Sequence, residues 1–337
     1  MPREALVTEL TSFQQQLMGT WTNQNLPGTD KGDITNPYSY NVMPLPQQSP
    51  QKDVSLGYIL KNFTYYETIV FRGQKSLEDK DEVLLPVAAP NRGSTFQQTP
   101  FVVFYDQQIR FAEGPGRVKL DQPGQVVHEE NGAWLYLKTE KQQIGPYPYP
   151  IGNPLLEPGD PDPQPSTQTL CKQISVPHGV SVVALGFFAA GSGEPTIPAA
   201  LSVLPMPEGL DTLPYPYGLE LTDDDNYQNP QPLLTLDITL PIKAAIADLR
   251  NAGNPVTDFI YCQVDDTNGG AVVDIPFEQQ RAATKGYSAV YWLMSIDGGA
   301  NYDILAYTQR ILIDIEINST HYTFPHPTSN VVTRVKA

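Results

Sequence analysis

The sequence predicts an all-β fold, a single large antiparallel β-barrel with an N-terminal capping helix and one further short helix. In residues 305–317 the odd positions are mostly apolar and the even positions mostly polar. This alternation is typical of a long strand with one face on a core. Ten to twelve such segments follow one another, and only two segments have a helical period. The 33 prolines and 25 glycines predict many loops between the strands.

The bulk properties favour one soluble globular domain. The chain of 337 residues is long enough for one large β domain, and no linker separates two cores, so we expect residues 1–337 to form one domain. The net charge of −16 would repel phosphate backbones and anionic membranes, so neither nucleic acid nor a membrane is an expected partner. The N-terminus lacks the pattern of a signal peptide and no apolar run could span a bilayer. We therefore expect a cytoplasmic protein.

The first half of the chain begins with an expected helix over residues 3–18, which Gly19 ends. Gly19-Thr20-Trp21 then opens the first strand. Further strands are expected at residues 58–71 and, with an interruption, at 101–112, and residues 86–100 are expected to form a loop.

The middle of the chain contains two proline-rich excursions, expected at residues 145–166 and 191–232. Before the first, residues 126–138 predict a hairpin with Asn131-Gly132 at its tip. Between the excursions, Pro177-His178-Gly179 is expected to join two strands.

The last third predicts a helix from Pro241 to about Gly253, followed only by strands. Asn268-Gly-Gly270 and Asp297-Gly-Gly299 are expected to supply hairpin turns. The expected strands are residues 259–264, 271–277, 287–294, 305–317 and 330–335.

Three motifs along this order resemble those of a known family. A helix followed by Gly19-Thr20-Trp21 resembles the start of the calycins, the lipocalin and fatty-acid-binding barrels. Together with Glu130-Asn-Gly132-Ala-Trp134 and Tyr307-Thr-Gln309, the pattern is similar to the nitrobindin-like heme-binding branch. The chain also resembles an uncharacterised bacterial and fungal group, through Pro177-His178-Gly179, Ile275-Pro-Phe277 and Pro325-His326.

The resemblance implies a heme-binding barrel that acts on small oxidants or nitrogen oxides. His326 would be the iron ligand, because the family has a histidine on its last strand, and Pro325 and Pro327 would hold its backbone. His178 is the second candidate, and the alternative for both histidines is a turn histidine without a ligand. The residues expected to line the heme slot are Phe63, Trp134, Tyr291 and Tyr307.

Two other functions stay open on the sequence. The barrel could bind a small hydrophobic ligand such as a fatty acid or pigment without catalysis, or it could be a structural or interaction protein filled by its own side chains. Whether the protein is an enzyme also stays open, since no nucleophile elbow, P-loop, dinucleotide fingerprint or His-Glu-x-x-His motif is present. We expect the pair Glu129-Glu130 to be solvated, the three tryptophans to be core residues, and Cys171 and Cys262 to be buried thiols.

Overall fold

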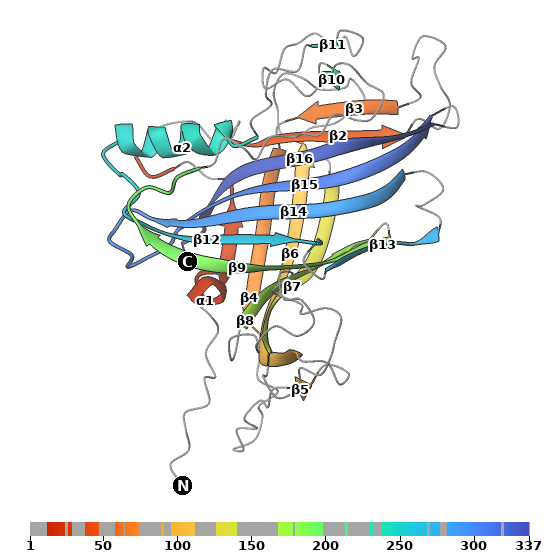
Figure 1. Ribbon diagram of the computed structural model, residues 1–337. Helices are drawn as coiled ribbons and strands as arrows, with labels where there is room; N and C mark the ends of the chain where they lie inside the picture. Colours follow the sequence, from red (N-terminus) through yellow and green to blue (C-terminus); the bar gives the residue numbers. More distant parts are fainter. Residues whose placement is uncertain are drawn as a thin grey trace, which may run out of the picture.

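The computed structural model describes sixteen stretches of the chain, and every structural statement below concerns these residues. They are residues 12–23, 26–28, 38–46, 58–63, 65–73, 89–90, 96–111, 126–139, 168–177, 179–197, 213–214, 230–231, 238–267, 270–276, 282–317 and 320–336. Within them, antiparallel strands close into a barrel and only two short helices are found (Figure 1). The predicted all-β class and the antiparallel barrel are confirmed.

Ten of the described strands form the barrel wall, each antiparallel to its neighbours. The ring closes where the first strand meets the last, with Trp21 opposite Arg334 and Thr22 opposite Thr333. In spatial order the strands are β1 (Gly19–Thr22), β4 (Tyr65–Gly73), β6 (Phe96–Phe111), β7 (Val126–Thr139), β8 (Gln168–Val176), β9 (Val180–Ser192), β12 (Asp258–Asp265), β14 (Ala282–Ser295), β15 (Ile304–Ile317) and β16 (Thr320–Arg334).

The remaining described strands are additions to this wall. β2 (Tyr40–Pro46) and β3 (Tyr58–Phe63) extend the sheet beside β16. β5 (Ala89–Pro90) pairs with β6, and β13 (Ala271–Asp274) pairs with β9. β10 (Leu213–Pro214) and β11 (Pro230–Gln231) form a separate two-stranded sheet.

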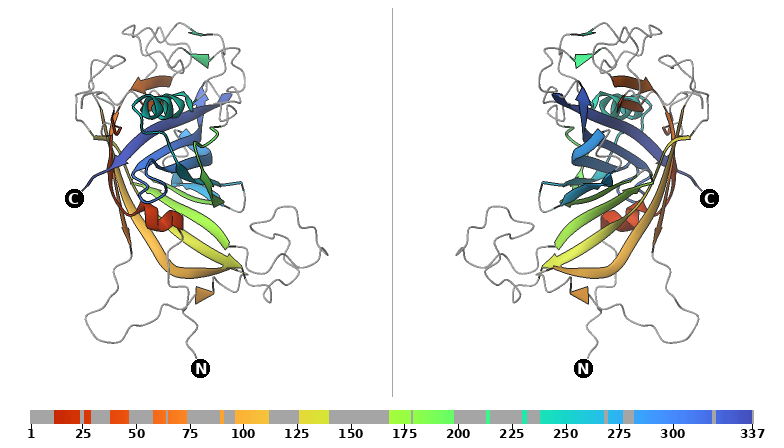
Figure 2. Two further views of the ribbon diagram at one scale, coloured as in Figure 1. Left: turned by 90° about the vertical axis from the view of Figure 1, so that its left-hand side faces the viewer. Right: turned by 90° about the vertical axis from the view of Figure 1, so that its right-hand side faces the viewer.

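The short helix α1 (Ser12–Leu17) lies inside the ring of strands near one end (Figure 2). Phe13 and Leu17 are fully buried there, and the Phe13 ring meets the Trp134 ring edge-on at 5.0 Å between centroids. Trp21 is also fully buried and donates its indole N–H to the carbonyl oxygen of Leu17 at 2.7 Å. The helix therefore closes the barrel, as the sequence predicted.

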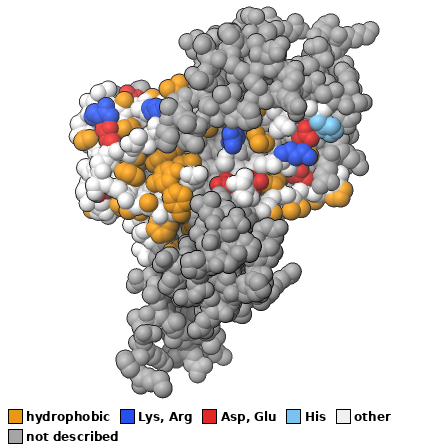
Figure 3. Space-filling model, viewed as in Figure 1, with side chains coloured by type: hydrophobic (Ala, Val, Ile, Leu, Met, Phe, Trp, Pro, Cys, Tyr) orange, Lys and Arg blue, Asp and Glu red, His pale blue; other side chains and the backbone are white. Residues whose placement is uncertain are grey.

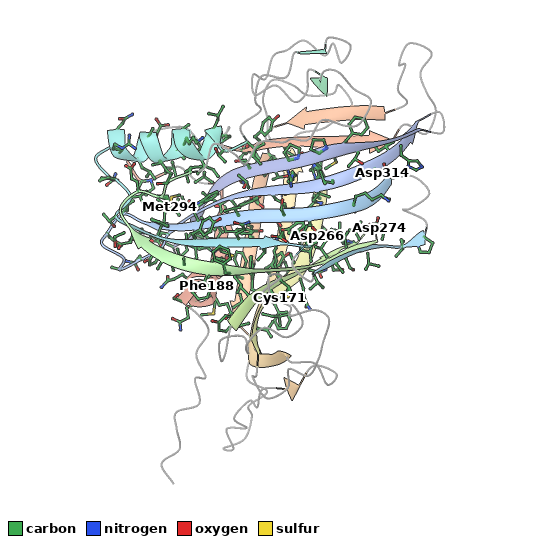
Figure 4. The ribbon with its side chains drawn as sticks, in the orientation of Figure 1. Cys171, Phe188, Asp266, Asp274, Met294 and Asp314 are labelled. Atoms are coloured by element: carbon green, nitrogen blue, oxygen red, sulfur yellow. The ribbon has the colours of Figure 1, made fainter. Side chains whose placement is uncertain are left out.

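Two large apolar clusters of the described residues lie on opposite faces of the wall, an interior core inside the barrel and an outer core on its outside. Because side chains alternate along a strand, Tyr291 and Leu293 of β14 point into the barrel while Trp292 and Met294 point outward. The outward residues lie under α2 (Leu240–Asn251), whose apolar stripe covers them (Figure 4). Strand β14 is therefore buried on both faces: its inward side chains belong to the interior core and its outward side chains to the outer core.

The predicted hairpin at Asn131-Gly132 is wrong, because both residues lie within the continuous strand β7. Asn131 and Gly132 pair with β6 on one side and β8 on the other. A Cβ atom on Gly132 would clash with the carbonyl oxygen of Gln173 and the ring of Tyr105. The glycine is therefore required by the close approach of neighbouring groups, not by a turn.

The boundaries of other strands and turns also differ from the predicted ones. β6 starts at Phe96, inside the expected loop, and passes Pro100 at a register shift between Gln98 and Val102. β16 starts at Thr320, because the segment expected to be a connection pairs continuously with β15. The hairpin partners expected on either side of Asn268-Gly-Gly270 do not pair with each other, since β12 and β13 both pair with β9; Asn268 and Gly269 themselves lie outside the described residues. The turn at Asp297-Gly-Gly299 is confirmed, with positive φ at both glycines.

Several predicted features lie wholly or partly outside the described residues, among them residues 3–11 of the expected N-terminal helix. The expected excursion over residues 145–166 lies outside the described residues, as does His178. Of the expected excursion over residues 191–232, Gly191 and Ser192 complete β9, and β10 and β11 fall within the rest.

Candidate functional site

Polar side chains gather in the barrel interior, although the interior is otherwise an apolar core. Six of them (Tyr105, Gln107, Lys172, Tyr291, Tyr307 and Gln309) line a cavity of about 10 Å³, which has room for about one water molecule, and the others contact these six or one another. We call them the interior polar cluster; its members are Glu67, Tyr105, Gln107, Glu130, Lys172, Tyr287, Tyr291, Tyr307, Gln309 and Asn330.

Lys172 of β8 is the cation of this cluster, and only 3% of its surface is exposed. Its ammonium donates to the hydroxyl oxygens of Tyr291 at 2.7 Å and Tyr287 at 3.0 Å. Burial works against the charge, but the phenol and carboxylate neighbours outweigh it and raise the pKa of Lys172. The nitrogen also lies 5.2 to 5.9 Å from the centroids of four rings, those of Tyr105, Trp134, Tyr287 and Tyr291.

Glu130 of β7 is the partner of this ammonium, with 3.6 Å between Oε1 and Nζ. Tyr105 donates its hydroxyl to the same oxygen at 2.5 Å, and Nε2 of His128 lies 3.4 Å from Oε2. Burial alone would raise the pKa of Glu130, but Lys172 and the hydrogen bonds from His128 and Tyr105 lower it to about 2. The expectation that Glu130 is solvated is wrong, because Glu129 points out of the barrel and Glu130 points in.

Glu67 of β4 is the second buried carboxylate, and three side chains donate to it. Tyr307 donates its hydroxyl, which lies 2.8 Å from each carboxylate oxygen, Asn330 donates to Oε2 at 2.6 Å, and Gln107 donates to Oε1. Burial raises the pKa of Glu67 to about 7 even though these three hydrogen bonds lower it. No cation is among its contacts in the described part of the chain, so Glu67 is able to hold or release a proton near neutral pH.

The two halves of the cluster are joined through aromatic rings and an amide. Tyr291 stacks on Tyr307 at 5.6 Å between centroids, which links the Lys172 side to the Glu67 side. Tyr287 donates its hydroxyl to Oε1 of Gln309 at 3.1 Å. Since Gln309 and Tyr307 both line the cavity, a molecule bound there would contact both halves.

Three of the predicted binding residues come together in this interior. Trp134, Tyr291 and Tyr307 all line the cavity, and the Trp134 and Tyr291 rings meet edge-on at 5.2 Å. The side chain of Phe63 lies outside the description.

His326, the predicted iron ligand, is half-buried on β16 opposite Ile311. It stands on the same face of the strand as Asn330, four residues further on. It does not line the interior cavity, and no group of three or more His, Cys, Asp or Glu suited to a metal ion occurs in the described ranges. A porphyrin needs a slot of several hundred Å³, so the cavity beside Trp134, Tyr291 and Tyr307 does not fit heme.

The sequence analysis missed Glu67 and Lys172 and misplaced Glu130. A signal was present in the strand alternation, because Lys172 stands between Leu170 and Ile174 on the apolar face of β8. Glu67 similarly shares a face with Tyr65 and Ile69. A charged residue at an inward position of a strand indicates a buried partner.

Comparison with known proteins does not identify a family for this chain. No family model and no curated protein matches the chain. Among solved structures, the crystal structure of Rv2717c from M. tuberculosis is similar over 97% of this chain and 100% of that chain, with 11% sequence identity and a TM-score of 0.33. A TM-score of this size does not establish a shared fold. Within the described residues, no helix has the length and apolar character to cross a bilayer.

Proposed function

We propose that the protein is a small-molecule-binding β-barrel whose ligand occupies the interior polar cluster. The observation that carries the proposal is the convergence of Lys172, Gln107 and Tyr307 on one cavity, with Glu67 hydrogen-bonded to two of them. A buried carboxyl group with a pKa of about 7 beside a cavity is typical of a site that exchanges protons with a ligand.

The size and lining of the cavity define the ligand class. A volume of about 10 Å³ restricts the ligand to about the size of a water molecule, and phenol, amide and ammonium groups suit a polar one. Small oxidants and nitrogen oxides, which the family resemblance implies, belong to this class. When such a ligand binds as an anion, its charge disfavours the carboxylate form of Glu67, so Glu67 takes up a proton from solvent on binding.

Calorimetric titration with nitrite, azide and hydrogen peroxide tests the proposal. Titrations in buffers of different ionisation enthalpy measure the protons exchanged on binding. We expect one of the three probes to bind with proton exchange at pH 7, and Glu67→Gln to remove the exchange and weaken binding at least tenfold. Glu129→Gln, a matched change on the outer face of β7, should alter neither. No binding of any probe to the folded protein, or unchanged binding in Glu67→Gln, would show that the proposal is wrong.

Heme bound through His326 of β16 is the second candidate, because the family resemblance implies it. An imidazole ligand must be neutral, so heme binding would weaken as the pH falls below about 6.5. Hemin titration followed by the visible absorption spectrum tests this function. A shifted band that His326→Ala removes and His128→Ala preserves would support heme; an unshifted spectrum would exclude it.

A fatty acid or pigment inside the barrel has less support, because the cavity is small and its lining carries a charge. If both titrations fail, the results would favour a structural or interaction role, in which the barrel is filled by its own side chains.

A further inference from the structure

We propose that a groove on the outer surface of the barrel, over β12, β14 and β15, is a second binding site and that its ligand is an organic ammonium ion with an apolar body. The groove has a volume of about 380 Å³, which lies within the usual range for small-molecule sites. Outward-facing residues such as Ser288, Val290 and Thr308 line it, so it is separate from the interior cavity. The site does not depend on the function proposed for the interior.

One part of the groove is apolar and preformed. Ile238, just before α2, and Val290 of β14 are buried residues, and Val290 belongs to the outer core. Leu312 of β15 adds a third apolar side chain. Because the packed outer core holds this wall in place, the apolar body of a ligand would need little ordering of the protein on binding.

The two basic side chains of the groove, Lys285 and Arg310, already have partners. The Lys285 ammonium lies 3.7 Å from Oδ2 of Asp314, which also lies 3.0 Å from Nδ1 of His321. Arg310 has an interaction partner as well. Figure 3 shows basic and acidic side chains together with a histidine toward one end of this outer face. An anionic ligand would have to break these contacts in order to use either positive charge.

Asp266, at the end of β12, is the acidic side chain of the groove that lacks a cationic partner (Figure 4). Its Oδ1 accepts the backbone N–H of Tyr287 at 3.0 Å, which holds the carboxylate in place. Within the part of the chain that the structure describes, Asp266 makes no ion pair and its Oδ2 accepts no hydrogen bond. A ligand ammonium beside Oδ2 would therefore supply the ion pair that these residues do not.

The other charges also favour a cation. Three carboxylates and two basic side chains of the described residues lie in or beside the groove, namely Asp265, Asp266, Asp314, Lys285 and Arg310. The chain as a whole carries a net charge of −16, which attracts cations from solution. At physiological ionic strength, charges more than about 8 Å away are largely screened, so the carboxylate of Asp266 determines the affinity there.

Calorimetric titration with hexylammonium, hexanoate and 1-hexanol at physiological ionic strength tests the site. The three probes share one apolar chain and differ in the charge of the head group. We expect hexylammonium to bind saturably and about tenfold more tightly than 1-hexanol, and hexanoate to bind more weakly than 1-hexanol. Hexylammonium that bound without saturation, or no more tightly than either of the other probes, would overturn the proposal.

Two variants separate the carboxylate from the apolar wall. Asp266→Asn keeps an oxygen acceptor for the N–H of Tyr287 but removes the charge, so hexylammonium should bind about tenfold more weakly while 1-hexanol binds as before. Ser288→Leu places a larger side chain in the groove, so both probes should bind more weakly, while circular dichroism confirms that the fold is kept.

Glu129→Gln is the matched control, because it removes an exposed carboxylate from the outer face of β7 and should change neither affinity. An unchanged affinity for hexylammonium in Asp266→Asn would show that the carboxylate does not hold the ligand. An unchanged affinity in folded Ser288→Leu would show that the ligand binds elsewhere. Either result would overturn the proposal.

Discussion

Glu67 and Glu130 are buried in the same barrel to the same degree, yet the pKa values of their carboxyl groups move in opposite directions. Both are at most 3% exposed, and each accepts a tyrosine hydroxyl. Glu130 also faces the Lys172 ammonium, and its pKa is about 2; Glu67 faces neutral donors, and its pKa is about 7. The comparison teaches that neutral hydrogen bonds alone do not offset the desolvation of a carboxylate here, whereas the Lys172 ammonium together with His128 and Tyr105 does.

The difference gives the two residues opposite effects on stability as the pH changes. The pKa of Glu67 is raised above the unfolded value of 4.5, so its contribution is complete below pH 4.5 and is lost as the pH rises through about 7. The pKa of Glu130 is lowered, so its contribution is present above pH 4.5 and is lost as the pH falls toward about 2.

Lys172→Met is expected to have the largest effect on stability, because it removes the main cause of the difference between the pKa values of Glu130 and Glu67. Glu130 would then be a buried carboxylate without its ammonium partner, which costs about 3–5 kcal/mol of unfolding free energy at pH 7. Urea denaturation measures the loss. The double variant Lys172→Met, Glu130→Gln should recover part of it, since neither member of the buried ion pair is then charged. A loss below about 1 kcal/mol in the single variant would mean that Lys172 does not stabilise Glu130.

The sequence predicts several of the strands and helices of the barrel, but not the contacts that set the pKa values of Glu67 and Glu130. The strand at residues 305–317 and the helix after Pro241 follow from local periodicity, and both are confirmed. The Lys172–Glu130 pair depends on the pairing of β7 with β8, which one sequence does not reveal. Asn131-Gly132 misled for the same reason, because the close approach of Gln173 and Tyr105, and not the local chain, requires the glycine.

The variant Glu67→Gln tests whether the pKa of Glu67 is raised in the folded protein. The wild type should lose stability relative to this variant by on the order of 3 kcal/mol between pH 4.5 and pH 7–8, because only the wild type must deprotonate a buried carboxyl group. Urea denaturation at a series of pH values measures the difference. Glu129→Gln should run parallel to the wild type. A Glu67→Gln curve that also ran parallel to the wild type would show that the pKa of Glu67 is not raised.

Tyr307→Phe weakens the hydrogen bonding of Glu67 while it keeps the ring stacked on Tyr291. Loss of a donor to both carboxylate oxygens should cost about 1–3 kcal/mol. Because that hydrogen bond lowers the pKa of Glu67, its removal should move the end of the pH-dependent loss to a higher pH. Tyr302→Phe, outside the cluster, should shift nothing. An unchanged pH profile of stability in Tyr307→Phe would show that the Tyr307 hydroxyl does not influence the pKa of Glu67.

Tyr287→Phe is expected to have the smallest effect and to act on the Lys172 side alone. The variant keeps the ring beside the ammonium but removes one hydroxyl acceptor at 3.0 Å and the hydrogen bond to Gln309 at 3.1 Å. We expect a loss of about 1 kcal/mol in urea denaturation, since Tyr291 and Glu130 still contact Lys172. The pH dependence due to Glu67 should stay as in the wild type, because Tyr287 makes no hydrogen bond to Glu67 or Tyr307. If instead Tyr287→Phe moved the pH profile as far as Tyr307→Phe, the two carboxylates would titrate as one coupled system, and the contrast between them would not be a property of each residue's own neighbours.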